Sequence, residues 1–140
     1  MHRVLIDTTL YIDWLNAGRH EEVLFQRDAV KYLSAVVMLE LYAGAFSPRD
    51  RRLVRSMVAA FNRADRLLVP SGVVYEDAGH VLRALRQSRG YQVARSRSIV
   101  NDVLIALSAR SIGATVITNN ARDFAAIRGV RPFKLTIVPA

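Results

Sequence analysis

The chain has 140 residues, the length of one ordinary domain, and residues 1–140 contain no repeat or linker that would divide them. Hydrophobic residues make up 51% of the chain, so a packed core is available, yet no apolar run is long enough to cross a membrane. The chain has no cysteine, which excludes disulfides and thiol chemistry. With no secretory leader at its start, we expect a single cytoplasmic domain.

The charge of the chain is strongly positive. Lysine and arginine number 20 against 12 acidic residues, a formal net charge of +8, and the only lysines are Lys31 and Lys134. The arginine guanidinium can bind phosphate or carboxylate through two parallel hydrogen bonds. This composition predicts a polyanionic partner, such as nucleic acid or an acidic peptide, and the alternative is a merely solvated basic surface.

Short apolar runs alternate with longer segments of helical period in the first half of the chain. β-branched and aliphatic runs predict three strands, at residues 4–6, 32–35 and 67–69. Helical spacing of apolar residues predicts four helices, at 8–16, 36–46, 48–61 and 73–89.

The second half of the chain repeats this alternation. We expect helices at 98–113 and 121–127 and strands at 114–118 and 135–138. Strands separated by helices imply right-handed crossovers, and therefore an α/β/α sandwich in which helices cover both faces of a central, mainly parallel sheet. Ligands of such sheets bind outside the carboxyl ends of the strands.

Four acids are expected at that edge of the sheet: Asp7, Glu40, Asp102 and Asp123. Each has a structural alternative, which is a helix cap for Asp7, an ion pair with arginine for Glu40, and a first-turn acid favoured by the helix dipole for the other two. Carboxylates gathered at one edge repel unless a cation lies between them, and Mg²⁺ and Mn²⁺ prefer oxygen ligands. Together with a basic surface, these acids predict a metal-dependent nuclease.

The acids lie in four motifs that follow one another along nearly the whole chain. The motifs are VLIDTT at residues 4–9, LEL at 39–41, NDVLIA at 101–106 and TNNARDF at 118–124. In this order they resemble the PIN-domain ribonucleases, and most of all the VapC-type toxins of bacterial toxin–antitoxin pairs. The resemblance implies a PIN-like sandwich and an endoribonuclease that hydrolyses RNA phosphodiesters with carboxylate-bound Mg²⁺ or Mn²⁺ and an activated water.

The resemblance also assigns roles to the acids. It implies that Asp7 and Asp102 bind the metal, that Glu40 completes the acidic cluster, and that Asp123 matches the fourth, more variable acid of the family. Asn119 and a second asparagine after it stand where some relatives carry an acid. The implied partners are an RNA substrate, a VapB-type antitoxin and a second copy of the chain in a homodimer.

Three further polar residues are expected near the acids. Thr8, Thr118 and Asn119 are candidates for holding a carboxylate or a water molecule, although a threonine after a strand is more often a cap or turn residue. On the first helix, Tyr11 and Trp14 are expected in the core, and a groove for a partner is the alternative.

A basic stretch precedes the helix that carries Asp102. Residues 83–97 contain five arginines and no acid. We expect this stretch to bind RNA phosphates, with Tyr91 stacking on a base, and the alternative is a solvated helix end. The candidate substrate-binding residues are Arg86, Arg89, Arg95 and Arg97.

Two other functional classes compete with a nuclease. The first is a non-catalytic RNA- or protein-binding module that keeps the PIN fold. The second is a Rossmann-like phosphatase, which is disfavoured because Thr9 stands where such enzymes carry a second acid and because no GxxxxGK phosphate loop is present.

Overall fold

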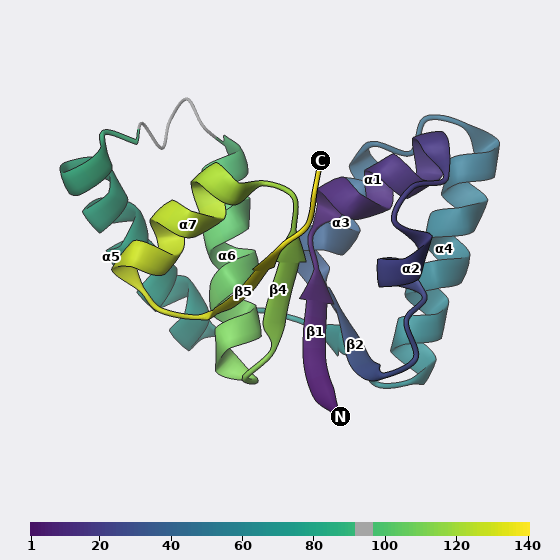
Figure 1. Ribbon diagram of the computed structural model, residues 1–140, viewed down its shortest axis with the longest axis horizontal. Helices are drawn as coiled ribbons and strands as arrows, with labels where there is room; N and C mark the ends of the chain where they lie inside the picture. Colours follow the sequence, from purple (N-terminus) through teal and green to yellow (C-terminus); the bar gives the residue numbers. More distant parts are fainter. Residues whose placement is uncertain (92–96) are drawn as a thin grey trace.

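A computed structural model describes residues 1–91 and 97–140, and in this part of the chain five strands form one sheet (Figure 1). The strand order is β3-β2-β1-β4-β5, and every pairing is parallel. The strands are β1 (His2–Ile6), β2 (Ala29–Ser34), β3 (Leu67–Leu68), β4 (Thr115–Thr118) and β5 (Lys134–Ile137). The predicted central parallel sheet is therefore confirmed.

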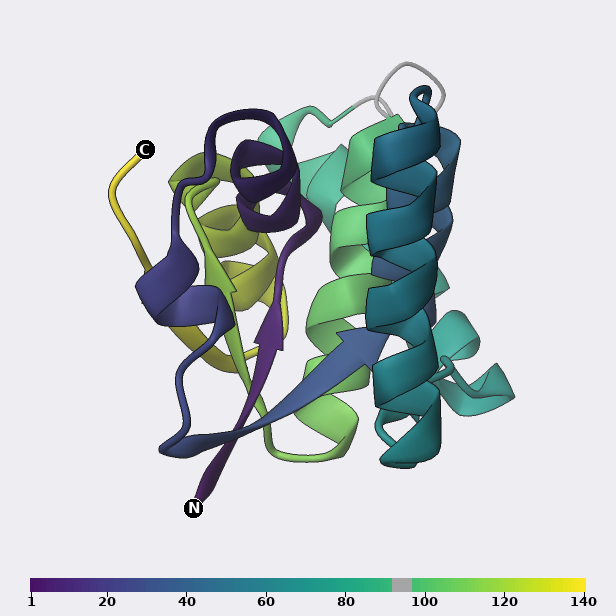
Figure 2. The ribbon, with the colours of Figure 1, turned by 90° about the vertical axis from the view of Figure 1, so that its right-hand side faces the viewer.

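Helices lie on both sides of this sheet. In Figure 1, the helices α1 (Thr8–Ala17), α2 (Glu21–Leu24) and α4 (Pro48–Arg63) lie to the right, and α3 (Ala35–Ala43) lies behind the upper end of β1. The helices to the left are α5 (Gly72–Arg89), α6 (Arg97–Ser111) and α7 (Ala121–Val130). In the view from the right-hand side of Figure 1, α1 lies above β1 and β2, with α2 to their left and α4 to their right (Figure 2). Because the chain moves from β1 outward to β3 and then returns to β4 beyond β1, right-handed crossovers place the two groups on opposite faces.

Polar caps set where several helices begin. Ser34, Ser47 and Ser71 each accept a hydrogen bond from a backbone N–H in the first turn of α3, α4 and α5 respectively. The first residue of α4 is Pro48, which needs no hydrogen-bond acceptor there. At the other end of α5, Gly90 takes the left-handed conformation (φ 69°) that ends the helix.

The core is centred on β1 and α6. Val4, Leu5 and Ile6 of β1 are buried between β2 and β4, and every residue of α6 from Asp102 to Ala109 is buried. Burial of each large aliphatic side chain contributes about 1.5–3 kcal/mol. Asp102 therefore lies at the start of the most deeply buried helical segment of the described chain. Within the described residues, none of the helices has the length and hydrophobicity needed to span a bilayer.

Three predicted boundaries differ by three residues from those of the structure, and one of them is the end of α7, which lies at Val130 and not at residue 127. Strand β2 begins three residues earlier than predicted, because Ala29 and Val30 pair with the start of β1. Helix α3 ends three residues earlier than predicted, where the N–H of Gly44 bonds to the Glu40 carbonyl (3.0 Å). The four-residue helix α2 was not predicted, because one helical turn is too short to show an apolar period.

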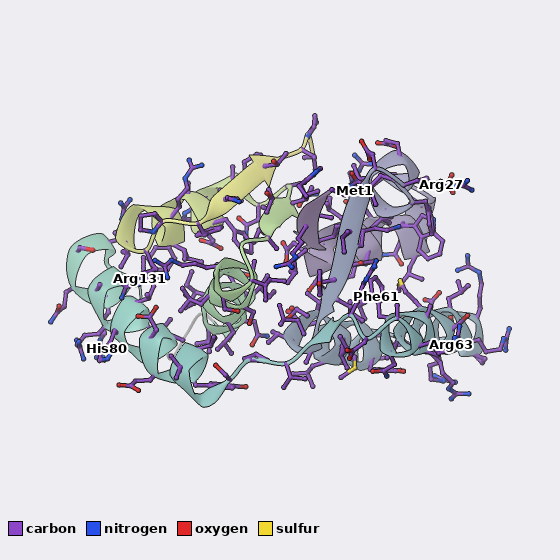
Figure 3. The ribbon with its side chains drawn as sticks, turned by 90° about the horizontal axis from the view of Figure 1, so that it is seen from below. Met1, Arg27, Phe61, Arg63, His80 and Arg131 are labelled. Atoms are coloured by element: carbon purple, nitrogen blue, oxygen red, sulfur yellow. The ribbon has the colours of Figure 1, made fainter. Side chains whose placement is uncertain are left out.

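An ion pair joins α5 to the residue that follows α7. Arg131 Nη2 and Nε donate hydrogen bonds of 2.6 and 3.1 Å to the two carboxylate oxygens of Asp77. In the view from below, Arg131 is seen on the side of the molecule that carries α5 (Figure 3). This two-fold contact fixes α5 and α7 relative to each other.

Candidate active site

Asp7 lies at the junction between β1 and α1. Its Oδ1 accepts a hydrogen bond from the N–H of Thr8 (2.8 Å), and its Oδ2 accepts bonds from the hydroxyls of Thr118 (2.8 Å) and Thr9 (3.2 Å). Asp7 is only 2% exposed, and burial raises the pKa of its carboxyl although the three hydrogen bonds oppose that rise. Asp7 is thus both the predicted helix cap and a buried carboxylate in a fixed orientation.

Glu40 is attached to the same junction through a hydroxyl. Thr8 Oγ1 donates a 2.7 Å hydrogen bond to Glu40 Oε1, which joins the start of α1 to α3. Among the described side chains, no lysine, arginine or histidine forms an ion pair with Glu40. The structure therefore does not show the ion pair considered as the structural alternative for this residue.

Asp102 carries the most strongly perturbed carboxyl of the site. It is 7% exposed, and burial raises its pKa to about 8, with further contributions from the charges of Asp7, Asp123 and Glu40. A charge affects a pKa this way only when it lies nearby in a poorly solvated region. Hydrogen bonds through Thr8, Thr118 and Asn120 also link the four predicted acids, which places them in one network.

Asn120 connects three of the polar residues of the site. Its side-chain N–H groups lie 3.2 Å from Asp123 Oδ2 and 3.5 Å from Asp102 Oδ2, and its Oδ1 accepts the N–H of Asp123 as the cap of α7. Its own backbone N–H donates to Thr118 Oγ1 (2.9 Å). Sequence reasoning considered Asn120 only as a replaced acid, whereas its place before a helix was a signal for this capping role.

Asp123 has a second donor, which comes from the end of α5. The hydroxyl of Tyr91 donates a 2.7 Å hydrogen bond to Asp123 Oδ1. Burial raises the pKa of Tyr91, and the hydrogen bond and the charge of Asp123 raise it further, so the phenol stays a hydrogen-bond donor at neutral pH. The hydroxyl is thus directed at an acid of the site, a contact not predicted from the sequence.

Of the three predicted supporting residues, two contact the acids. Thr8 and Thr118 hold Glu40 and Asp7 as described above. Asn119 instead donates to Asp13 Oδ2 on α1 (3.3 Å), which also lies 3.0 Å from His20 Nε2.

The predicted RNA-binding arginines are only partly within the described chain. Arg86 and Arg89 are exposed in the last turn of α5. A Cβ added at Gly129 would lie 2.5 Å from Arg89 Nη2, so this guanidinium rests against the last turn of α7. Arg95 and the side chain of Arg97 lie outside the described residues.

The donor set of the site is suited to a divalent cation. Its four acids offer carboxylate oxygens, the ligand type that Mg²⁺ and Mn²⁺ prefer, and burial of Asp102 disfavours an ionised carboxylate that has no cation beside it. Among the described side chains, however, no three His, Asp or Glu residues are spaced closely enough to hold a metal ion. The chemistry of the donors therefore fits such an ion, while their spacing is wider than that of a formed metal centre.

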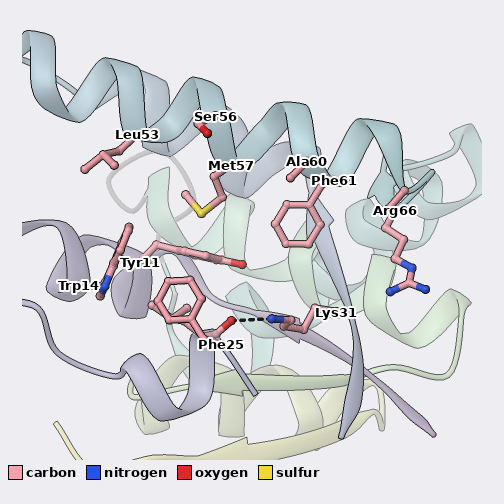
Figure 4. A pocket seen from close by; sticks show the side chains of 12 residues that line it. Tyr11, Trp14, Phe25, Lys31, Leu53, Ser56, Met57, Ala60, Phe61 and Arg66 are labelled. Carbon is pink, nitrogen blue, oxygen red and sulfur yellow. Dashed lines mark hydrogen bonds between the residues drawn. The ribbon is translucent and has the colours of Figure 1, made fainter. Parts of the chain in front are cut away.

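An apolar pocket of about 420 Å³ lies apart from the acids, between α1, α2, α4 and β2 (Figure 4). The Trp14 and Phe25 rings meet edge to face at one side of it, with their centroids 5.4 Å apart. Burial lowers the pKa of Lys31, whose ammonium donates to the Leu24 carbonyl (2.9 Å). Tyr11 is buried as predicted, whereas Trp14 is only half-buried and lines the pocket.

Known structures share this fold. DNA-bound VapBC from Salmonella typhimurium is 23% identical, with a TM-score of 0.69 over 98% of this chain and 98% of that chain. VapBC2 from Rickettsia felis, bound to a DNA fragment from its promoter, is 21% identical, with a TM-score of 0.68 over 97% of this chain and 98% of that chain. VapBC-5 from Mycobacterium tuberculosis is 23% identical, with a TM-score of 0.64 over 99% of this chain and all of that chain (100%).

These identities establish a common fold and no more. No curated protein matches the chain. The model of the PIN domain, in contrast, matches residues 4–130, a span that includes all four acids of the site. The chain therefore belongs to the PIN-domain family.

Proposed function

We propose that this protein is a metal-dependent endoribonuclease and the toxin of a type II toxin–antitoxin pair. The observation that supports the proposal is the set of hydrogen bonds through Thr8, Thr118 and Asn120, which links the carboxylates of Asp7, Glu40, Asp102 and Asp123. Bound there, Mg²⁺ or Mn²⁺ would supply an activated water and neutralise the charge that grows on a phosphodiester.

Each acid has a role in this proposal. Asp7 and Asp102 hold the metal, and Asp7 is already oriented by three donors. The Oε1 of Glu40 is occupied by the Thr8 hydroxyl, so Oε2 is the oxygen that accepts a proton from the attacking water. Asp123, at the start of α7, completes the negative surface that faces the substrate.

The substrate in this proposal is RNA. The net charge of +8 attracts a polyanion, and the exposed arginines at the end of α5 supply phosphate contacts close to the acids. Arg86 and Arg89 are the described members of this group, and the proposed RNA contacts also include Arg95 and Arg97.

The proposed partners are an antitoxin of the VapB type and a second copy of the chain. Several structures with this fold are VapBC complexes. The apolar pocket beside Trp14 and Phe25 offers a site for an apolar segment of such an antitoxin. Exposed apolar side chains on and just after α3, which are Leu39, Tyr42 and Phe46, support a homodimer. We place the pair in the cytoplasm.

RNA cleavage with metal and with chelator tests the proposal. We expect the purified chain to cleave RNA in the presence of Mg²⁺ or Mn²⁺, and we expect EDTA to abolish this cleavage. Asp7→Asn and Asp102→Asn should each lower the rate by about 100-fold or more, while Asp28→Asn, which changes an exposed acid before β2, should not. Full activity in either of the first two variants would refute the assignment.

Among the described side chains, no three acids form a group that could hold a metal ion, which favours a second candidate, a non-catalytic RNA-binding module that keeps the fold. Such a module would bind RNA equally well with Mg²⁺ and with EDTA and would not cleave it. Measuring RNA binding and cleavage on the same preparation separates the two functions.

A further inference from the structure

Tyr91 is held in place from three directions. Its backbone N–H bonds to the Leu85 carbonyl (3.4 Å), directly after the left-handed Gly90 that ends α5. Its ring is half-buried and packs against the hydrophobic core. Its hydroxyl reaches Asp123 Oδ1 at 2.7 Å, across 32 positions of the sequence. The orientation of the phenol is therefore determined by the fold.

The hydrogen bond from Tyr91 is not needed to build the fold around it. The start of α7 is already capped by Asn120 Oδ1, which accepts the N–H of Asp123. The attachment of α7 to α5 is already provided by the two hydrogen bonds between Arg131 and Asp77. The feature that depends on Tyr91 is therefore the orientation of the Asp123 carboxylate.

That carboxylate lies at one end of a chain of contacts that leads into the site. Tyr91 occupies Asp123 Oδ1, and the amide of Asn120 lies 3.2 Å from Asp123 Oδ2 and 3.5 Å from Asp102 Oδ2. With each of its oxygens engaged by a neutral donor, the Asp123 carboxylate is held in a single orientation. Loss of either donor would let the carboxylate rotate.

We propose that Tyr91 is a positioning residue of the active site: its hydroxyl fixes Asp123, and through Asn120 it fixes the spacing between Asp123 and Asp102. The proposal rests on the ribonuclease function proposed above. It differs from the base-stacking role expected from the sequence, because stacking would use the ring and positioning uses the hydroxyl. A phenylalanine at this place keeps the ring and lacks the hydroxyl, so it separates the two roles.

The first experiment compares Tyr91→Phe with Tyr75→Phe, the same chemical change at an exposed tyrosine in the first turns of α5. We expect Tyr91→Phe to lower kcat for RNA cleavage about 10-fold, with KM for RNA changed less than about twofold. Its affinity for Mn²⁺, measured by calorimetry, should fall about threefold or more, since the acids lose their spacing. Tyr75→Phe should match the wild type in all three quantities.

The second experiment is a double-mutant cycle with Asp123→Ala. If Tyr91 acts through Asp123, then Tyr91→Phe should change kcat and Mn²⁺ affinity less than about twofold in the Asp123→Ala background. A loss that persists in full in this background would overturn the proposal, as would wild-type kcat in Tyr91→Phe. An increase in KM in Tyr91→Leu, where the ring is lost, together with wild-type kcat and Mn²⁺ affinity in Tyr91→Phe, would also overturn it and would assign base stacking.

The failure of the ribonuclease function can be told apart from the failure of this proposal. A wild-type chain that does not cleave RNA refutes the function. The positioning role is then judged by Mn²⁺ affinity alone, and an unchanged affinity in Tyr91→Phe refutes it. Thermal unfolding of each variant confirms that the fold is retained.

Discussion

The hydroxyl of Thr118 donates a 2.8 Å hydrogen bond to Oδ2 of Asp7, across 111 positions of the sequence. Both residues are almost fully buried, with exposures of 0% and 2%. The contact is possible because β4 lies directly beside β1 in the sheet. The first acid of the site is therefore oriented by a residue from the far end of the chain.

Replacing Thr118 by valine tests how much this bond contributes. Thr118→Val keeps the shape of the side chain and removes a buried donor, so we expect a loss of about 1–3 kcal/mol in the free energy of unfolding. The pKa of Asp7, which burial raises, should rise further, because the bond from Thr118 lowers it. A raised pKa penalises the ionised form of the folded protein, so stability is lost as pH rises. Urea unfolding should therefore show a larger loss at pH 8 than at pH 4, and an equal loss at both would contradict this account.

The buried Asp102 predicts an unusual dependence of stability on pH. Its pKa rises from 3.8 to about 8 on folding, so the folded protein binds this proton more tightly than the unfolded chain. The metal-free protein should therefore lose stability as pH increases through this interval. Asp102→Asn removes the ionisation, and at pH 9 in EDTA it should be more stable than the wild type by about 1–3 kcal/mol.

Chemical denaturation between pH 5 and pH 9 in EDTA measures this effect. Added Mg²⁺ should restore much of the stability of the wild type at high pH and none in Asp102→Asn. If the free energy of unfolding changes equally with pH in the wild type and in Asp102→Asn in EDTA, ionisation of Asp102 does not destabilise the fold and the prediction is wrong.

A substitution at Glu40 distinguishes a nuclease from a non-catalytic binding module. Glu40→Gln retains an oxygen that accepts the Thr8 hydroxyl, so the free energy of unfolding should change by less than about 1 kcal/mol. RNA cleavage should fall about 100-fold or more, because an amide cannot accept a proton from water. The matched control is Glu22→Gln, at an exposed acid on α2. Wild-type cleavage by the Glu40 variant would favour another proton acceptor.

Arg86 tests the basic surface at the end of α5. Arg86→Ala removes one expected phosphate contact. It should weaken RNA binding and lower the slope of log K against log salt concentration by about 1. Arg63→Ala, in the last turn of α4, removes the same charge at a distant site (Figure 3) and should leave that slope nearly unchanged. If the two variants behave alike, Arg86 belongs to a solvated surface.

Much of the fold could be predicted because local patterns determine it. The apolar run before Asp7 predicted a buried strand, and the acid after it predicted a residue at the carboxyl end of that strand. Since the carboxyl ends of parallel strands lie at one edge of the sheet, the sequence predicts Glu40, Asp102 and Asp123 at the same edge as Asp7. In the structure, hydrogen bonds through Thr8, Thr118 and Asn120 link these acids to one another.

The contacts between these acids could not be predicted in the same way. The amide of Asn120 lies beside Asp102 because α6 and the start of α7 pack together, and no local pattern encodes that packing. Likewise, a tyrosine in a basic stretch is typical of RNA binding, and only the fold shows that the hydroxyl of Tyr91 meets Asp123. Side-chain direction depends on tertiary packing, which residue type alone does not specify.

The strand order has a consequence for the newly made protein. Translation delivers Asp7 and Glu40 in the first third of synthesis, but β4 must pair with β1 before Asp123 can join them. The lining of the apolar pocket, in contrast, comes entirely from residues 11–66. On a ribosome that extends the chain from its N-terminus, this surface leaves the exit tunnel well before the last acid does. The residues that line the pocket are thus synthesised before the set of carboxylates is complete.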